Sequence, residues 1–168
     1  IMYTTTGGHA NTLQINYILD GAGRKYQFNY NASYKLTSIQ YLGSGSTALQ
    51  TVTYNIDASL GTLTSVTYPG SRTVSYLWSG TALTEVKNSD NYKVNFTYTG
   101  STAYYKVYTI REYGTNSTLG QGVNVTYGKY QTTYTDNLTG EKEILQFDSC
   151  GNVICIQDSN GNAHFGKY

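Results

Sequence analysis

The chain has 168 residues, enough to bury a core, and its formal net charge is +1 at pH 7. This charge balance, with no basic cluster, argues against binding to nucleic-acid phosphates. No apolar run approaches the roughly 18 residues that a membrane-spanning helix needs. We therefore expect neither a nucleic-acid partner nor a membrane span in this segment.

The composition favours strands over helices. Charged residues make up only 12% of the chain, whereas Tyr occurs 19 times, Gly 18 times and Pro once. Residues of this kind suit pleated strands joined by tight turns and form helices poorly. Apolar residues do not recur with helical spacing over three turns in any window. The sequence therefore predicts an all-β fold.

A pair of aliphatic residues separated by two others recurs along the chain. The pairs are Ile15/Ile18, Leu36/Ile39, Leu63/Val66, Leu83/Val86, Val107/Ile110 and Val153/Ile156, with a degraded copy around Tyr134 and Asp136. Similar words ("LTSIQY", "LTSVTY", "LTEVKN") support this register, and the period is about 20 to 24 residues with insertions. We expect residues 1–168 to be a single array of about seven units, cut from a longer protein.

Each pair is followed by a turn signal and then by a strand in which alternate residues are apolar or aromatic. These runs are Tyr26, Phe28 and Tyr30; Val74, Tyr76 and Trp78; Tyr92, Val94, Phe96 and Tyr98; and Val123, Val125 and Tyr127. A period of two predicts a half-buried strand, so each unit is expected to be an antiparallel β-hairpin. Because a lone hairpin is only marginally stable, we expect the hairpins to pair edge to edge in one twisted sheet.

The turns carry an Asp-x-x-Gly motif in three places, Asp20/Gly23, Asp148/Gly151 and Asp158/Gly161. The Asp side chain is expected to accept hydrogen bonds from backbone N–H groups two or three residues further on. The Gly is expected to take a positive φ where the turn closes. Pro69-Gly70 suits a type II turn instead.

The C-terminal stretch "FDSCGNVICIQDSNGNAHFGKY" shows the unit most clearly. It places Phe147, Asp148, Gly151, Val153, Ile156, Asp158 and Gly161 in the order aromatic-Asp-x-x-Gly-x-aliphatic-x-x-aliphatic-x-Asp-x-x-Gly, and Phe147, Val153, Ile156 and Phe165 are its expected core positions. This order resembles the YD repeat of RHS-type proteins, especially the secreted and wall-associated ones of Gram-positive bacteria. Asp20, Gly23, Tyr26 and Phe28 are similar to a second copy.

The resemblance implies a sheet that spirals into a hollow shell or barrel-like wall. In that family such walls enclose a C-terminal toxin effector or form an adhesion scaffold at the cell surface, and carbohydrate binding has been attributed to the repeat. We therefore expect a structural segment of a large secreted or cell-wall-associated bacterial protein, whose partners are further repeats of the same chain and either an enclosed effector or cell-surface glycans. The family's self-cleaving Asp-Pro-x-Gly motif does not occur, so proteolytic activity is not carried over.

Two alternatives to the architectural role remain open at this stage. Trp78 and Tyr76 are candidate contacts for cell-surface glycans, although a strand that stacks its aromatic residues between repeats explains them equally well. The open edges of an array could also let the chain associate with itself as filaments.

Catalysis and cofactor binding are not expected. His9 and His164 lack Cys or carboxylate neighbours at metal-ligand spacing, and the few acidic residues lie mostly at turns. Cys150 and Cys155 are interpreted as free thiols, because a bridge would require a turn residue to reach a returning strand. A disulfide remains the alternative for this pair.

Overall fold

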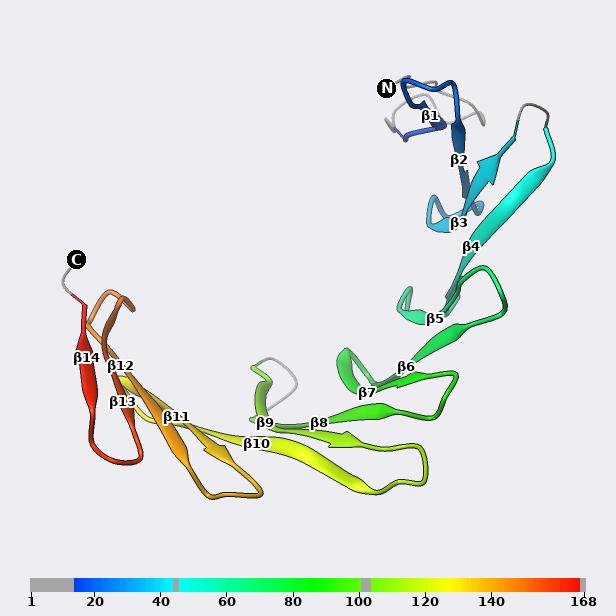
Figure 1. The fold of residues 1–168 in the computed structure, drawn as a ribbon. Helices are drawn as coiled ribbons and strands as arrows, with labels where there is room; N and C mark the ends of the chain where they lie inside the picture. The colour runs from blue at the N-terminus through cyan, green and yellow to red at the C-terminus, as the bar shows by residue number, and fades with distance from the viewer. Residues whose placement is uncertain (1–13, 44–45, 101–103, 167–168) are drawn as a thin grey trace. The chain divides into compact units, whose positions relative to one another are not determined.

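The structure is a computed structural model, and it describes residues 14–43, 46–100 and 104–166. These residues form fourteen β-strands and no helix (Figure 1), which confirms the all-β prediction. The strands are β1 (Tyr17–Leu19), β2 (Lys25–Tyr30), β3 (Leu36–Leu42), β4 (Ala48–Ile56), β5 (Leu63–Thr67), β6 (Thr73–Ser79), β7 (Ala82–Asn88), β8 (Lys93–Thr99), β9 (Lys106–Tyr113), β10 (Leu119–Tyr127), β11 (Gln131–Asp136), β12 (Lys142–Phe147), β13 (Val153–Asp158) and β14 (Ala163–Phe165). The described residues include no helix long and apolar enough to cross a membrane.

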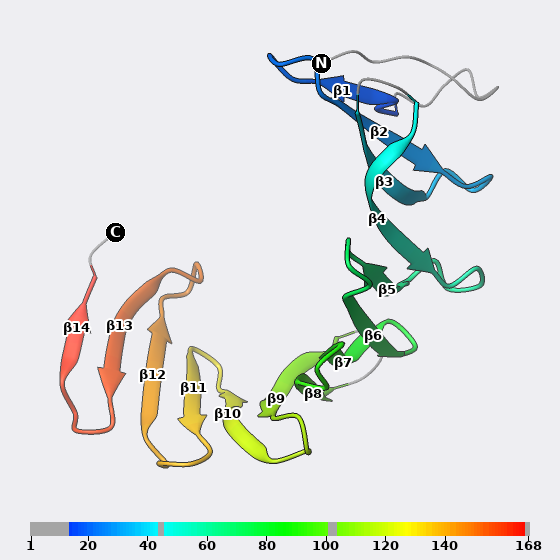
Figure 2. The same cartoon turned by 45° about the vertical axis from the view of Figure 1, so that its right-hand side comes forward.

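The chain divides into two compact units, Ile1–Tyr76 and Leu77–Tyr168, and β6 runs from the first into the second. Within each unit the hydrogen-bonded neighbours follow the order of the chain, and the paired strands are antiparallel. Figure 2 shows this succession of hairpins clearly from β11 to β14. The predicted series of consecutive antiparallel hairpins is therefore present in both units.

In the first unit the sheet has one apolar and one polar face. Phe28, Ile39 and Val52 lie directly opposite one another across β2, β3 and β4, and so share a face. Asn29 and Ser38 form the next cross-strand pair and point to the other face, because side chains alternate along a strand. The Asn29 Nδ2 donates a hydrogen bond of 2.9 Å to Ser38 Oγ.

The second unit repeats this division over β8, β9 and β10. Phe96, Ile110 and Val123 lie opposite one another across β8, β9 and β10. Thr109 and Asn124 form the next pair, on the polar face, where Thr109 Oγ1 donates to Asn124 Oδ1 at 3.0 Å. The alternation of apolar and polar residues in the sequence thus becomes two chemically different surfaces.

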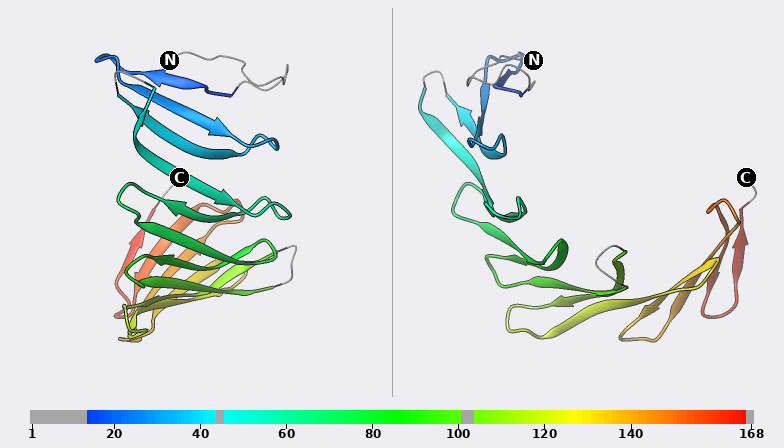
Figure 3. Two further views of the ribbon diagram at one scale, coloured as in Figure 1. Left: turned by 90° about the vertical axis from the view of Figure 1, so that its right-hand side faces the viewer. Right: turned by 180° about the vertical axis from the view of Figure 1, so that it is seen from behind.

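Each unit is a single layer of strands. Among the described residues of each unit, the strands contact only their neighbours along the chain, as the two views of Figure 3 illustrate. The buried apolar residues are Leu42, Val66, Ala82, Val125 and Cys155, and no large side chain is fully buried. The apolar faces are therefore only half-covered, by the lateral contacts of their own side chains.

β-Bulges explain the spacing of the aliphatic pairs. In a regular strand, residues three apart point to opposite faces. In β3, however, Leu36 lies opposite Tyr30 and Ser38 lies opposite Asn29, so Thr37 is an extra residue. The bulge returns Leu36 to the face of Ile39. The register shifts in the same way at Thr64, Tyr108 and Ile154, within β5, β9 and β13.

Three positional expectations are wrong. Tyr92 lies in the turn before β8 and not in the strand, because the N–H of Asn88 bonds its carbonyl at 2.9 Å and closes the turn there. Ile156 and Phe165 were expected in the core but are exposed, Phe165 to 81%, because β14 is only three residues long and covers little of its neighbour. Cys155, which points to the opposite face from Ile156, is buried, at 4% exposure.

Candidate functional site

The residues of the predicted Asp-x-x-Gly motifs build hairpin turns. Asp148 Oδ1 accepts hydrogen bonds from the N–H groups of Cys150 at 2.8 Å and Asn152 at 2.9 Å. Gly151 has a φ of 88°, as predicted. The second N–H lies four residues beyond the Asp, and not three. Asp20 and Asp158 accept the equivalent pair of bonds in turns closed by Gly23 and Gly161, which also have positive φ.

The carboxyl groups of these turns are held in their ionised form. The side-chain amide of Asn152 lowers the pKa of Asp148, and backbone N–H groups add to the effect. The amide of Asn162 lowers the pKa of Asp158 in the same way. For Asp20 the largest cause of the lowered pKa is the backbone N–H of Arg24. A general acid needs the opposite shift, so these groups serve the turns.

Two further turns of the same geometry lack Asp-x-x-Gly and were not predicted. Asn31 and Asn88 replace Asp, and each Oδ1 accepts bonds from the N–H groups two and four residues further on. Tyr34 and Asn91 occupy the glycine position with φ values of 62° and 65°. The signal that could have revealed them is an Asn at the hairpin spacing, since its side-chain oxygen accepts the same bonds.

A longer turn occurs at Asp57 and Asp136. There Oδ1 accepts bonds from the N–H groups two and three residues further on, and the positive φ moves to Gly61 and Gly140, four residues after the Asp. The sequence pattern is Asp-x-x-x-Gly, one residue longer than the motif that was sought.

Three tyrosine hydroxyls connect a hairpin repeat to the start of an earlier hairpin repeat. The hydroxyls of Tyr30 and Tyr98 donate to the carbonyls of Ile15 and Leu83, each fifteen residues earlier. Tyr127 donates to the carbonyl of Val107 at 2.8 Å. These carbonyls belong to the first residue of an aliphatic pair, so the hydroxyls mark the register of the repeat.

The two predicted glycan contacts lie on β6. Tyr76 and Trp78 are both half-buried, two residues apart on the strand. Trp78 follows Leu63, the first residue of an aliphatic pair, by fifteen residues. Tyr30 and Tyr98 follow the first residue of their own aliphatic pairs by the same number of residues. Neither residue lines the hollows described next, which were not predicted.

A hollow of about 590 Å³ lies in the second unit beside the bulge at Tyr108. We call it the Tyr127 hollow; its lining is Thr99, Gly100, Tyr104, Lys106, Tyr108, Val125, Thr126 and Tyr127. Tyr104 is 78% exposed, and Tyr108 and Tyr127 are also exposed. Burial raises the pKa of Tyr127, and Tyr134 adds to the effect. The hollow thus presents aromatic surface and hydroxyl groups to solvent.

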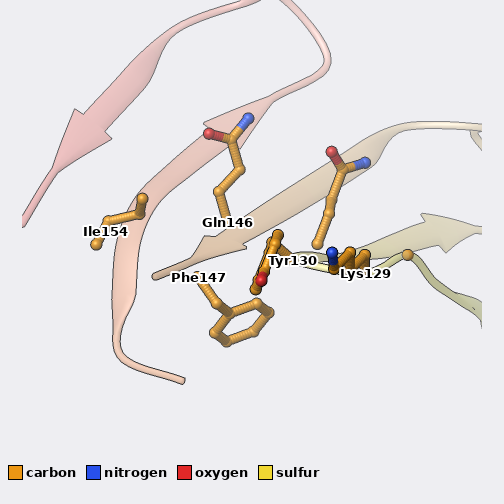
Figure 4. Close-up of a pocket in the computed structure, with 7 residues that line it drawn as sticks. Lys129, Tyr130, Gln146, Phe147 and Ile154 are labelled. Atoms are coloured by element: carbon orange, nitrogen blue, oxygen red, sulfur yellow. The ribbon is translucent and has the colours of Figure 1, made fainter. Parts of the chain in front are cut away.

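A second hollow, of about 460 Å³, lies beside the bulge at Ile154 and is called the Tyr130 hollow (Figure 4). It is lined by Gly128, Lys129, Tyr130, Gln131, Gln146, Phe147 and Ile154. Lys129 Nζ lies 5.2 Å from the centre of the Tyr130 ring, and Lys106 Nζ lies 5.0 Å from that of Tyr127. Both hollows therefore combine a bulge, an aromatic ring and a lysine.

The cysteines and histidines do not come together in the described part of the chain. Cys150 is exposed on a turn and Cys155 is buried on β13, both as free thiols. His164 is exposed on β14, and His9 lies outside the described residues. No group of three His, Cys, Asp or Glu side chains suited to a metal ion occurs among residues 14–43, 46–100 and 104–166.

Comparison with known proteins gives weak structural likenesses. No protein-family model and no curated protein sequence matches the chain. A porin-like protein from Bacteroides uniformis ATCC 8492 is similar over 76% of this chain and 55% of its own, with 14% identity and a TM-score of 0.48. The TcdB2-TccC3-Cdc42 structure is similar over 83% of this chain and 10% of its own, with 13% identity and a TM-score of 0.35. These values assign no family, so the YD-repeat resemblance stays a prediction.

Proposed function

We propose that the chain is a non-catalytic structural segment that forms part of a β-sheet wall in a large secreted or cell-surface bacterial protein of the RHS/YD-repeat type. One observation carries this proposal: over β2 to β4 of the first unit and β8 to β10 of the second, the sheet is a single layer with a polar face and an apolar face. Such a layer separates two environments, because its polar face is suited to contact with water and its apolar face is not.

The apolar face is large enough to need a cover. It holds rows of aromatic and aliphatic side chains such as Phe96, Ile110 and Val123, and Ile110 remains exposed. Contiguous exposed apolar surface of this kind marks an interaction site in soluble proteins. In the proposed wall this face lies against the enclosed cargo or the scaffold interior, and the face of Thr109 and Asn124 meets solvent.

The turns support the same role. Each Asx side chain satisfies the N–H groups of its own turn, so each hairpin is closed locally and does not depend on a particular partner at the turn. This is the property that allows a repeat array to lengthen by simple addition of units.

Cysteine labelling in the full-length protein tests the proposal. Ile110→Cys places a thiol on the apolar face, and Thr109→Cys places a matched thiol on the polar face, both in a Cys150→Ser background. We expect Ile110→Cys to react slowly with a maleimide in the full-length protein and quickly in the isolated segment. Thr109→Cys should react quickly in both. Equal rates for Ile110→Cys in the two proteins would contradict a covered apolar face.

The Tyr127 hollow favours a second candidate function, adhesion to cell-surface glycans. Aromatic rings stack on sugar rings, and here Tyr104 and Tyr108 are both exposed and line the same hollow. Titration with glycans tests it: Tyr108→Ala should abolish binding, and Trp78→Ala should leave it unchanged. Binding that is lost in Trp78→Ala and kept in Tyr108→Ala would place the glycan site on β6 instead. A lack of binding by the unsubstituted chain would eliminate this candidate function.

A further inference from the structure

The polar face of the second unit contains an arginine without a partner. Arg111 lies on β9 and is half-buried, yet its guanidinium makes no hydrogen bond or ion pair within the described part of the chain. A guanidinium carries five N–H donors in a fixed planar arrangement that matches a carboxylate. Arg24, in the turn between β1 and β2, by contrast contacts Asp20 at 2.5 Å.

Arg111 sits at the centre of a polar row. Asn95 on β8 and Gly122 on β10 lie directly opposite it, so the three residues share a face. Asn137, in the turn after β11, joins the row because its N–H donates to the Gly122 carbonyl at 2.8 Å. We call these four residues the Arg111 cradle.

Two side-chain amides of the cradle are unsatisfied. Asn137 Nδ2, a donor, and Asn95 Oδ1, an acceptor, are both buried and lack a hydrogen-bond partner. A buried polar atom without a partner costs about 1–3 kcal/mol, so such atoms call for an explanation. They are the only two of their kind among the described residues, and both flank the same arginine.

Gly122 lies directly beneath the Arg111 side chain. A Cβ at this position would lie 2.5 Å from Arg111 Nε and 3.0 Å from Asn137 Nδ2, so the two nitrogens are at most 5.5 Å apart. A larger residue would displace the Arg111 side chain, which lies directly over the glycine. A β-bulge directly precedes Gly122, where Gly120 and Gln121 together face Glu112. Bulges of this kind commonly redirect side chains next to functional sites.

We propose that the Arg111 cradle binds a carboxylate that has a hydroxyl group beside it. The carboxylate oxygens accept from the Arg111 guanidinium and from Asn137 Nδ2, and the hydroxyl donates to Asn95 Oδ1. One ligand thereby satisfies both orphaned amides. A free hydroxy acid and an acidic sugar share this chemistry.

The neighbouring charges leave room for such a ligand. Asp136 is an acid that senses the Arg111 charge: the backbone N–H groups of Thr139 and Leu138 are the main causes of its lowered pKa, and the Arg111 charge adds a smaller effect. Its Oδ1 is already occupied by those two N–H groups. Glu85, in the same row, is paired with Lys93 at 3.1 Å. Neither acid forms an ion pair with Arg111.

Nuclear magnetic resonance titration of the side-chain amide signals tests the proposal on the intact chain. Glycolate should shift the signals of Asn95 and Asn137, acetate should shift chiefly Asn137, and chloride should shift neither. Glucuronate distinguishes the two sources: stronger binding than that of glycolate points to an acidic sugar, and equal or weaker binding to a free hydroxy acid.

Substitutions complete the test. Arg111→Gln should weaken glycolate binding about tenfold or more, since hydrogen bonds to charged groups are strong. Arg72→Gln, on an exposed arginine of the first unit, should leave it unchanged. Gly122→Ala, checked for folding by circular dichroism, should displace the Arg111 side chain and weaken glycolate binding. Equal shifts with chloride and glycolate, or glycolate binding that survives Arg111→Gln, would overturn the proposal.

Discussion

Single residues at the turns determine where each hairpin reverses. One Asx oxygen accepts two backbone N–H groups, and one residue with positive φ closes the turn. Glycine adopts that φ without strain, whereas other residues pay about 1–2 kcal/mol. Gly23 and Gly151 follow this rule, while Tyr34 and Ser117 hold positive φ values of 62° and 57° with a side chain. The array therefore tolerates some strain at its turns.

The turn at Asp20 offers a matched pair of substitutions. Gly23 has a φ of 75°, whereas Gly21 does not have positive φ, and a Cβ at either would meet nothing within 4 Å. Gly23→Ala should lower the free energy of unfolding by about 1 kcal/mol, because Ala strains the left-handed backbone. Gly21→Ala should raise it by roughly 0.5 kcal/mol, because Ala lowers the conformational entropy of the unfolded chain. Urea denaturation measures both, and equal effects would show that φ does not decide this turn.

The turn carboxylates should make stability depend on pH. Because their folded-state pKa values lie below the unfolded value of about 3.9, they stabilise the fold above that pH. This contribution is lost as the pH falls below about 4 towards the lowered folded pKa values. Asn31 and Asn88 make the same bonds without a charge.

The double variant Asp148→Asn/Asp158→Asn should therefore fold at pH 7 and lose less stability than the parent between pH 7 and pH 3. Urea midpoints across this range measure the difference. Asp148→Ala is the control, since it removes the acceptor and should destabilise the turn at every pH. An unchanged pH dependence in the double variant would assign acid sensitivity to other groups.

At the scale of the element, a bulge and two side-chain hydroxyls define the repeat. The Thr after the first aliphatic residue donates to the facing strand: Thr37 to the Asn29 carbonyl, Thr64 to that of Asn55, and Thr84 to that of Leu77. At Leu36-Thr37 and Leu63-Thr64 the "LT" of the sequence thus marks a bulge with its own hydrogen bond. The second hydrogen bond comes from the tyrosine hydroxyl, which donates to the backbone carbonyl of an aliphatic residue earlier in the chain. We call this bond the tyrosine tie.

The tyrosine tie should be measurable. Tyr30→Phe removes the hydroxyl that donates to the Ile15 carbonyl at 3.0 Å and should lower the free energy of unfolding by about 1 kcal/mol. Tyr54→Phe, in the same unit, should change it by less than about 0.5 kcal/mol, because the Tyr54 hydroxyl makes no hydrogen bond within the described part of the chain. Chemical denaturation of both variants provides the comparison. If the two lose the same stability, the tie contributes nothing to the repeat.

Sequence patterns predicted the strands because alternation and turn residues act locally. The Asp-x-x-Gly turns at Asp20, Asp148 and Asp158 were predictable for the same reason. The bulge at Thr37 was not, since an extra residue appears only when two strands are paired. The Arg111 cradle was also missed, because Asn95, Arg111, Gly122 and Asn137 come from four separate segments. The pairing of strands brings them together, and no single stretch carries the signal.

On the scale of the whole molecule, the core is limited because the described residues of each unit form only one layer. Stability comes from strand pairing and from a small number of buried side chains, among the described residues chiefly Val66 and Val125 with Leu42, Ala82 and Cys155. Repeat arrays of this kind gain stability from contacts between neighbours. Their apolar face remains available for the partner that the proposed wall requires.

Truncation of a buried side chain should therefore lower the free energy of unfolding as much here as in a protein with a second layer. This holds only at the few buried positions. Val125 is 3% exposed on the apolar face, and Leu119 on the same strand is 62% exposed. Val125→Ala should lower the free energy of unfolding by about 2 kcal/mol, whereas Leu119→Ala should change it by less than about 0.5 kcal/mol. Urea denaturation of the isolated chain measures both. If Val125→Ala cost no more than Leu119→Ala, the lateral contacts within the sheet would not act as a core, and stability would have to reside in strand pairing and turns alone.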